Sequence, residues 1–213
     1  EGRIIFSDDQ DRQTFLSLLD KTQELTQIRL LAFCLMDNHY HLILQNLSGR
    51  MSEFFKQLNG QYGTYFRKRY GGRGYVFQDR YKSKLIQDEA YLMLSIAYVL
   101  NNPVKASLAR SYDKYPWSSG GAYFKEECDG SLVDCNYVND LFCSVKELKK
   151  WIISTQDLDE LPTVKSEMGL IVGGEEFIER AEELANRRSG LESTKMRRLN
   201  DRYFEPVEKV IQE

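Results

Sequence analysis

The only two histidines of the chain, His39 and His41, are separated by one residue within an apolar run. Alternate side chains of a strand project from the same face, so a strand here would place both imidazoles side by side. Two neutral imidazoles on a rigid element form half of a divalent-metal site. A pair of core or surface histidines on an ordinary strand is the competing interpretation, and the pair alone does not decide between them.

A second pair of chemically useful residues lies on a predicted helix. Tyr98 and Asn102 are four residues apart, which places them one turn apart on the same helix face. A phenol can act as a nucleophile and an amide oxygen as a metal ligand. An amphipathic helix with a half-buried Tyr and a C-capping Asn is the alternative. The apolar stripe that should face the core consists of Met93, Ile96, Ala97 and Leu100.

The charge is distributed unevenly along the chain. The formal net charge is −3, but residues 51–120 hold 11 Lys and Arg against five Asp and Glu. Residues 121–213 hold 13 against 20. A basic middle and an acidic end are compatible with a phosphate-binding surface confined to one region.

The hydrophobic pattern predicts the elements that must position these residues. We expect a helix over about 7–22, strands over 28–36 and 39–45 joined as a hairpin, a helix over 51–70, a strand over 75–86, and a helix over 88–102 that Pro103 ends. This order predicts an α+β fold in which helices pack on an antiparallel sheet.

The pattern changes after about residue 125. Residues 146–153, 175–187 and 192–213 are predicted helices separated by polar or Gly-rich breaks. We therefore divide the chain into a catalytic domain, residues 1–125, and a helical C-terminal extension, residues 126–213. No apolar stretch approaches the roughly 20 residues of a membrane span. The four cysteines form no Cys-x2-Cys pair, and we expect a cytoplasmic, nucleoid-associated protein with Cys34 buried and reduced.

Five segments, in order, resemble the REP-associated branch of the single-tyrosine transposases. His39-Tyr40-His41 resembles the His-hydrophobe-His signature of that family. Residues 98–106 resemble its Tyr-Ile-x-x-Asn-Pro-Val-Lys segment. The remaining similar segments are residues 5–12, 76–82 and 115–119. The resemblance covers roughly residues 3–123.

The resemblance implies a ferredoxin-like, RRM-like core and cleavage and rejoining of single-stranded DNA, at hairpin-forming repeats. His39 and His41 would bind Mg²⁺ or Mn²⁺, with Asn102 as third ligand. Tyr98 would attack the scissile phosphorus and form a 5′-phosphotyrosine. Tyr40 departs from the aliphatic residue of the signature; we expect it to pack on the opposite face, with a role as nucleophile as the alternative. The similarity starts after the family's first strand, so we expect a sheet that is one strand short.

Basic residues next to aromatic ones favour contact with single-stranded or hairpin DNA. The residues predicted to make these contacts are Arg67, Lys68, Arg69, Arg73, Arg80, Lys82, Lys84 and Lys105. A solvated strand face and cations that complement a helix dipole are the alternative interpretation.

Two other functions compete with the transposase. One is a domesticated DNA-binding protein that retains the fold without cutting, and the other is an RNA-binding sheet domain without metal at the histidine pair. A homodimer is possible, with the tyrosine reaching its own histidine pair or that of a partner.

Overall fold

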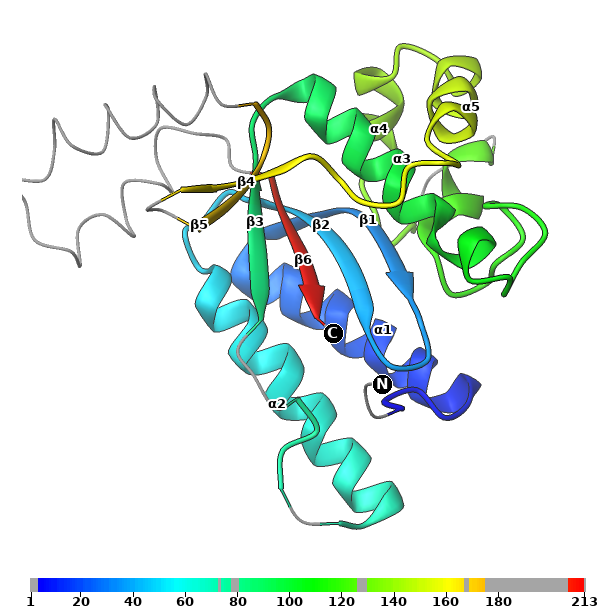
Figure 1. The fold of residues 1–213 in the computed structure, drawn as a ribbon. Coiled ribbons are helices and arrows are strands. Elements are labelled where there is room, and N and C mark those ends of the chain that lie inside the picture. Colours follow the sequence, from blue (N-terminus) through cyan, green and yellow to red (C-terminus); the bar gives the residue numbers. More distant parts are fainter. Residues whose placement is uncertain are drawn as a thin grey trace, which may run out of the picture.

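The computed structural model describes residues 4–72, 74–77, 81–125, 130–166 and 169–174, together with the backbone of 207–212. It shows one mixed sheet with helices packed against it, which confirms the α+β class (Figure 1). The elements are α1 (Asp9–Thr26), β1 (Ile28–Leu35), β2 (Tyr40–Asn46), α2 (Met51–Tyr70), β3 (Lys82–Ile86), α3 (Glu89–Lys105), the 3-10 helix η1 (Ser119–Phe124), α4 (Cys135–Leu141), α5 (Val145–Ser154), β4 (Thr163–Ser166), β5 (Gly169–Val172) and β6 (Val207–Gln212). Within the described ranges no helix is long and apolar enough to cross a membrane.

The six strands lie in the order β1-β2-β6-β3-β5-β4. Neighbouring strands are antiparallel except for β3 and β5, which are parallel. The predicted hairpin of β1 and β2 is confirmed, with Cys34 opposite His41. The expected gap of one strand is not present, because β6 fills the position between β2 and β3.

The extension differs from its predicted helical character. Residues 145–154 form α5 as expected, but residues 207–212, assigned from the sequence to a helix, form the strand β6. β4 and β5 also join the sheet, so later parts of the chain complete a sheet that the first part begins. Valine and isoleucine at 207, 210 and 211 suit a strand. The predicted helix over 175–187 lies outside the described residues, and the domain boundary at 125 stays a prediction.

The helices α1 and α2 cover one face of the sheet. Tyr40 of β2 is fully buried and packs on Phe15 of α1, and its hydroxyl donates to Asn59 of α2 at 2.8 Å. The helix α3 packs against β1 and β2 on the other face (Figure 1). Because side chains alternate along β2, His41 faces the α3 side.

The helix α3 continues past the point where its proline was expected to end it. Pro103 lies inside the last turn, and the helix ends at Lys105. Proline has no N–H to offer the carbonyl four residues back, which belongs to Val99. The side-chain amide of Asn102 donates to the Val99 carbonyl at 3.4 Å and to that of Tyr98 at 3.1 Å, and so replaces the missing donor.

The strand predicted over 75–86 is shorter than expected. β3 begins only at Lys82, and residues 75–77 form an irregular segment in which Val76 and Phe77 pack toward α2. The preceding Gly74 has a φ of 99°, a backbone conformation that interrupts a strand. The tertiary contact with α2 therefore determines the conformation of this segment.

Candidate functional site

The two imidazoles converge as the spacing of the histidines predicted. The Nε2 atoms of His39 and His41 are 3.1 Å apart, and the ring planes cross at 86°. His41 is buried and His39 is half-buried. Two nitrogens bound to one ion at about 2.1 Å lie roughly 3.0–3.4 Å apart for bond angles of about 90–109°. The pair therefore fits two positions in the coordination shell of one metal ion.

The ring of His39 is oriented by its neighbour in the turn. Its Nδ1 lies 2.7 Å from Oδ1 of Asn38, an atom that can only accept a hydrogen bond. This contact suits the tautomer of His39 with its proton on Nδ1, in which Nε2 carries the lone pair that a metal would take. Gln45, which follows the histidines on the same strand, accepts from Arg29 at 3.1 Å.

Metal binding needs ligands beyond this pair. Within the described part of the chain, no three His, Cys, Asp or Glu side chains gather to hold an ion. Neutral oxygen donors, phosphate oxygens or water would have to complete the shell around two histidines. Asn102 was predicted as the third ligand, and its amide nitrogen is directed at its own helix. Its Oδ1 is therefore the atom left for a ligand role.

Tyr40 lies between the two histidines in sequence but on the other side of the sheet. Its burial and its bond to Asn59 hold it among the side chains of α1 and α2. Burial raises the pKa of its hydroxyl above the ordinary range of a tyrosine, which disfavours the phenolate. This position supports packing for Tyr40 and not nucleophilic attack.

The structure holds Tyr98 against the segment that follows α5. Its hydroxyl donates to the carbonyl of Asp159 at 3.2 Å. The ammonium of Lys105 lies 5.2 Å from the centre of the Tyr98 ring and donates to the carbonyl of Leu158. The side chain of Asn101 is buried and donates to Thr155 at 3.0 Å, which ties the same helix to α5.

Sequence reasoning did not find these partners. Leu158 and Asp159 contribute only backbone carbonyls to Lys105 and Tyr98, so no side-chain pattern marks them. The hydrogen bond to Asp159 occupies the Tyr98 hydroxyl in the conformation described, at an exposed position.

Lys82 and Lys84 lie on the sheet face that carries the histidines. Tyr81 stacks on Phe55 of α2, so the side chains of alternate residues, Lys82 and Lys84, project to the other side. Lys82 and His41 are both paired with the same residue of β6. One intervening strand places their Cα atoms about 9.5 Å apart, at two strand spacings. Lys84 donates to Thr163 at 3.1 Å. Arg73 and Arg80 lie outside the described residues.

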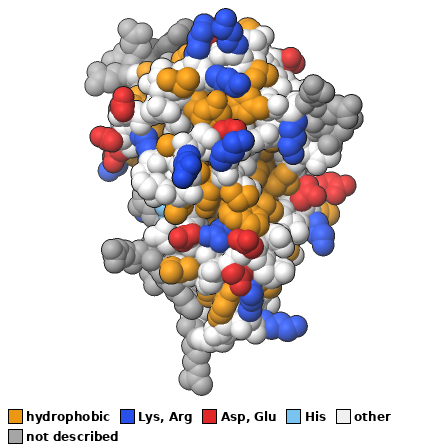
Figure 2. Space-filling model, turned by 90° about the vertical axis from the view of Figure 1, so that its right-hand side faces the viewer, with side chains coloured by type: hydrophobic (Ala, Val, Ile, Leu, Met, Phe, Trp, Pro, Cys, Tyr) orange, Lys and Arg blue, Asp and Glu red, His pale blue; other side chains and the backbone are white. Residues whose placement is uncertain are grey.

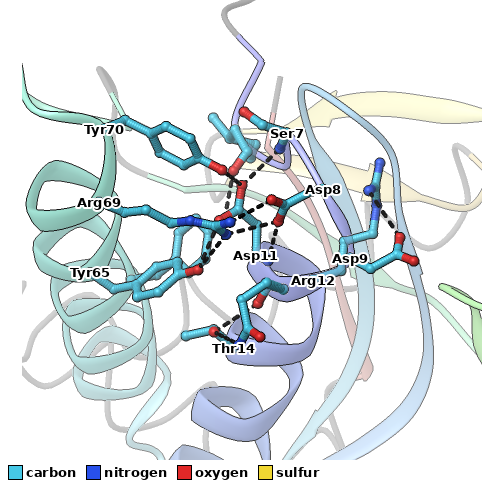
Figure 3. Close-up of polar contacts among 12 residues, drawn as sticks. Ser7, Asp8, Asp9, Asp11, Arg12, Thr14, Tyr65, Arg69 and Tyr70 are labelled. Carbon is cyan, nitrogen blue, oxygen red and sulfur yellow. Dashed lines mark hydrogen bonds and ion pairs between the residues drawn. The ribbon is translucent and has the colours of Figure 1, made fainter.

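The three basic residues at the end of α2 have different surroundings. Arg69 is bound by Asp8 and Asp11 at the start of α1, with 2.7 Å to the Asp11 carboxylate (Figure 3). The charge of Arg69 is thus matched within the protein, and its contact with DNA stays a prediction. Lys68 is exposed, and Arg67 is half-buried with a 3.5 Å contact to Thr64.

Asp11 is the centre of the network that joins α1 to α2. Its side chain is fully buried and accepts four hydrogen bonds (Figure 3). The donors are the Ser7 N–H at 2.8 Å, the Tyr65 hydroxyl at 2.9 Å, Arg69 at 2.7 Å and the Tyr70 hydroxyl at 2.9 Å. The hydrogen bond from Arg69 holds the pKa of Asp8 below its usual value. This network fixes the helix that lines one face of the sheet.

Comparison with known protein families gives the site its context. Residues 2–102 match the family described as transposase IS200 like. Over these residues the chain is therefore similar to IS200-like transposases. The matched segment contains the histidine pair, Tyr98 and Asn102, and it supports a role in DNA transposition with DNA as the partner. Comparisons with curated proteins and with solved structures found no match.

Proposed function

We propose that this IS200-like chain is a metal-dependent enzyme that cleaves and rejoins single-stranded DNA at hairpin-forming repeats, as in the REP-associated branch. The observation that carries the proposal is the 3.1 Å approach of the two histidine nitrogens, on the sheet face against which the Tyr98 helix packs. His39 and His41 would hold Mg²⁺ or Mn²⁺, and Asn102 would contribute its Oδ1. The bound ion would polarise the scissile phosphate.

Tyr98 is the proposed nucleophile. Its oxygen would attack the phosphorus, the bond from phosphorus to the 3′ oxygen would break, and the phenolic proton would leave to solvent while the departing 3′ oxygen takes up a proton. The product is a 5′-phosphotyrosine and a free 3′-hydroxyl. Attack by a 3′-hydroxyl reverses the reaction, so rejoining needs no nucleotide triphosphate.

Attack requires the Tyr98 hydroxyl to leave the carbonyl of Asp159. The hydrogen bond between them is 3.2 Å long, and the tyrosine is half-buried, so the loss of this contact is a modest cost. Lys105 beside the ring provides a positive charge for a phosphate or for the developing phenolate.

The DNA is proposed to follow the face that carries Lys82 and Lys84. The side of the molecule formed by α4, α5 and the neighbouring loops mixes apolar surface with charges of both signs (Figure 2). Its exposed apolar residues include Leu108, Val145 and Ile153. A phosphate backbone binds where positive charge is concentrated, and Lys82 and Lys84 supply it on the β3 side.

The alternative is a DNA-binding protein that does not cut. The engagement of the Tyr98 hydroxyl by Asp159 is the observation in its favour. The two functions are separated by incubating the protein with a 5′-labelled single-stranded hairpin oligonucleotide and Mn²⁺. We expect a covalent adduct on a denaturing gel that Tyr98→Phe abolishes and the matched control Tyr40→Phe retains. DNA binding without an adduct on the wild-type chain would leave the non-cleaving function.

A further inference from the structure

A hollow of about 800 Å³ lies on the sheet face opposite the histidine pair, between α2 and the segment that leads into β3. This volume is within the range of sites that bind small organic groups. The side chains that give it chemical character are Phe55, Lys56, Asn59, Arg67, Tyr75 and Tyr81. Neither the family match nor the proposed chemistry uses this hollow.

Aromatic rings form its walls. Tyr81 stacks on Phe55 with ring centres 4.1 Å apart and planes 25° apart. Tyr75 also lines the hollow, although 80% of its surface is exposed. An exposed ring beside a stacked aromatic pair provides the flat apolar surface on which a nucleobase stacks.

Two glycines line the hollow. Gly60 and Gly63 are in the interior of α2, where glycine is less favourable than alanine. A Cβ at Gly60 would meet no atom within 4 Å, so a larger side chain there would extend into open space. A Cβ at Gly63 would lie 3.8 Å from Val76 and 3.4 Å from the Arg67 guanidinium, so Gly60 is the position of the two where a side chain has open space to enter.

Two cations also line the hollow. Lys56 and Arg67 are on the same face of α2 as the glycines, and the guanidinium of Arg67 lies over Gly63, 3.4 Å from the position that a Cβ would take there. Among the described residues neither forms an ion pair with a carboxylate. Two such cations beside aromatic rings provide positive charge for phosphates next to a stacked base.

We propose that this hollow binds an unpaired nucleobase of the single-stranded DNA, with Lys56 and Arg67 on the phosphates beside it. The proposal rests on the proposed function. The hollow and the histidine pair lie at the same end of the sheet, because Tyr81 immediately precedes β3 and His39 immediately precedes β2. A DNA single strand that bends around this end of the sheet would contact both faces of the sheet.

The test uses the full chain and a 12-nucleotide single strand that carries one 2-aminopurine, whose fluorescence falls when it stacks on an aromatic ring. Tyr75→Ala should weaken binding about 5- to 150-fold, the effect of losing one stacked base. Gly60→Leu should abolish the quenching while its melting temperature stays at or above that of the wild type. Gly60→Ala is the matched control and should bind like the wild type.

The outcomes separate this proposal from the proposed function. Wild-type affinity and quenching in both Tyr75→Ala and Gly60→Leu would overturn the nucleobase site, whatever Tyr98 does. Quenching without a Tyr98 adduct would overturn the cleavage reaction and leave the nucleobase site. Displacement of the oligonucleotide by equimolar dTMP would show a mononucleotide site and overturn the proposal.

Discussion

The buried carboxylate of Asp11 offers the sharpest test of how the structure is held together. Substitution by Asn keeps the shape of the side chain but replaces one acceptor oxygen by an NH₂ group. If the NH₂ group takes the position of Oδ2 it faces the Ser7 N–H, and if it takes the position of Oδ1 it faces the guanidinium of Arg69. Neither neighbour can accept a hydrogen bond, so both orientations of the amide set a donor against a donor.

The expected decrease in the free energy of unfolding of Asp11→Asn follows from the hydrogen bonds that are lost. A hydrogen bond to a charged group contributes about 1.5–3 kcal/mol, and two are lost on either side of the carboxylate. The exposed Tyr70 can turn its hydroxyl to water, which places the total near the lower end, at about 3 kcal/mol. For a chain of this size the melting temperature should fall by about 6–12 °C.

Thermal unfolding followed by circular dichroism measures this shift. The control is Asp9→Asn, because the Asp9 side chain is 77% exposed and lies 3.9 Å from Arg12. Its melting temperature should change by no more than about 2 °C, as for other exposed sites. Equal melting temperatures for Asp11→Asn and Asp9→Asn would refute the assigned role of the network.

Three further results are expected. Fluorescence anisotropy titrations at several salt concentrations should show that Lys82→Gln binds a DNA single strand more weakly, with the slope of log affinity against log salt concentration smaller by about 0.7. The control is Lys114→Gln, which should leave that slope unchanged because the Lys114 ammonium pairs with Asp113. Mn²⁺ at about 100 times its dissociation constant should raise the free energy of unfolding of the wild type by about 2.7 kcal/mol, measured by urea unfolding. A similar gain in His39→Asn would contradict metal binding by the histidine pair. Burial raises the pKa of Tyr115 to about 12, so this tyrosine ionises at lower pH in the unfolded chain than in the folded one. The contribution of Tyr115 to the free energy of unfolding should therefore be lost as the pH rises from about 10 through 12. Tyr115→Phe should flatten that part of the profile, and an unchanged profile would show that Tyr115 does not cause it.

Local patterns were sufficient where one element carries the whole signal. The period of two along β2 predicts that both imidazoles share a face and that Tyr40 takes the other, because a strand alternates its side chains regardless of what surrounds it. The spacing of Tyr98 and Asn102 predicts neighbours on α3 for the same kind of reason. The amphipathic stripe is likewise confirmed, with Ile96, Ala97 and Leu100 buried.

Local patterns failed where a distant segment supplies the partner. Proline was expected to end α3, but a neighbouring amide replaces its missing hydrogen bond. The pairing of Arg69 with two carboxylates of α1 could not be inferred from the residues around Arg69 in the sequence. The position between β2 and β3 is filled from residues 207–212, more than 120 positions away from β3.

The sequence by itself therefore determined the α+β class, the hairpin of the histidines and the strand face that the two imidazoles share, since these follow from the geometry of single elements. Only the tertiary structure decided which strand completes the sheet, which cations remain on the surface, and that Tyr98 lies against Asp159. These depend on backbone groups and charges brought together from remote parts of the chain, and no periodicity within one element records such contacts.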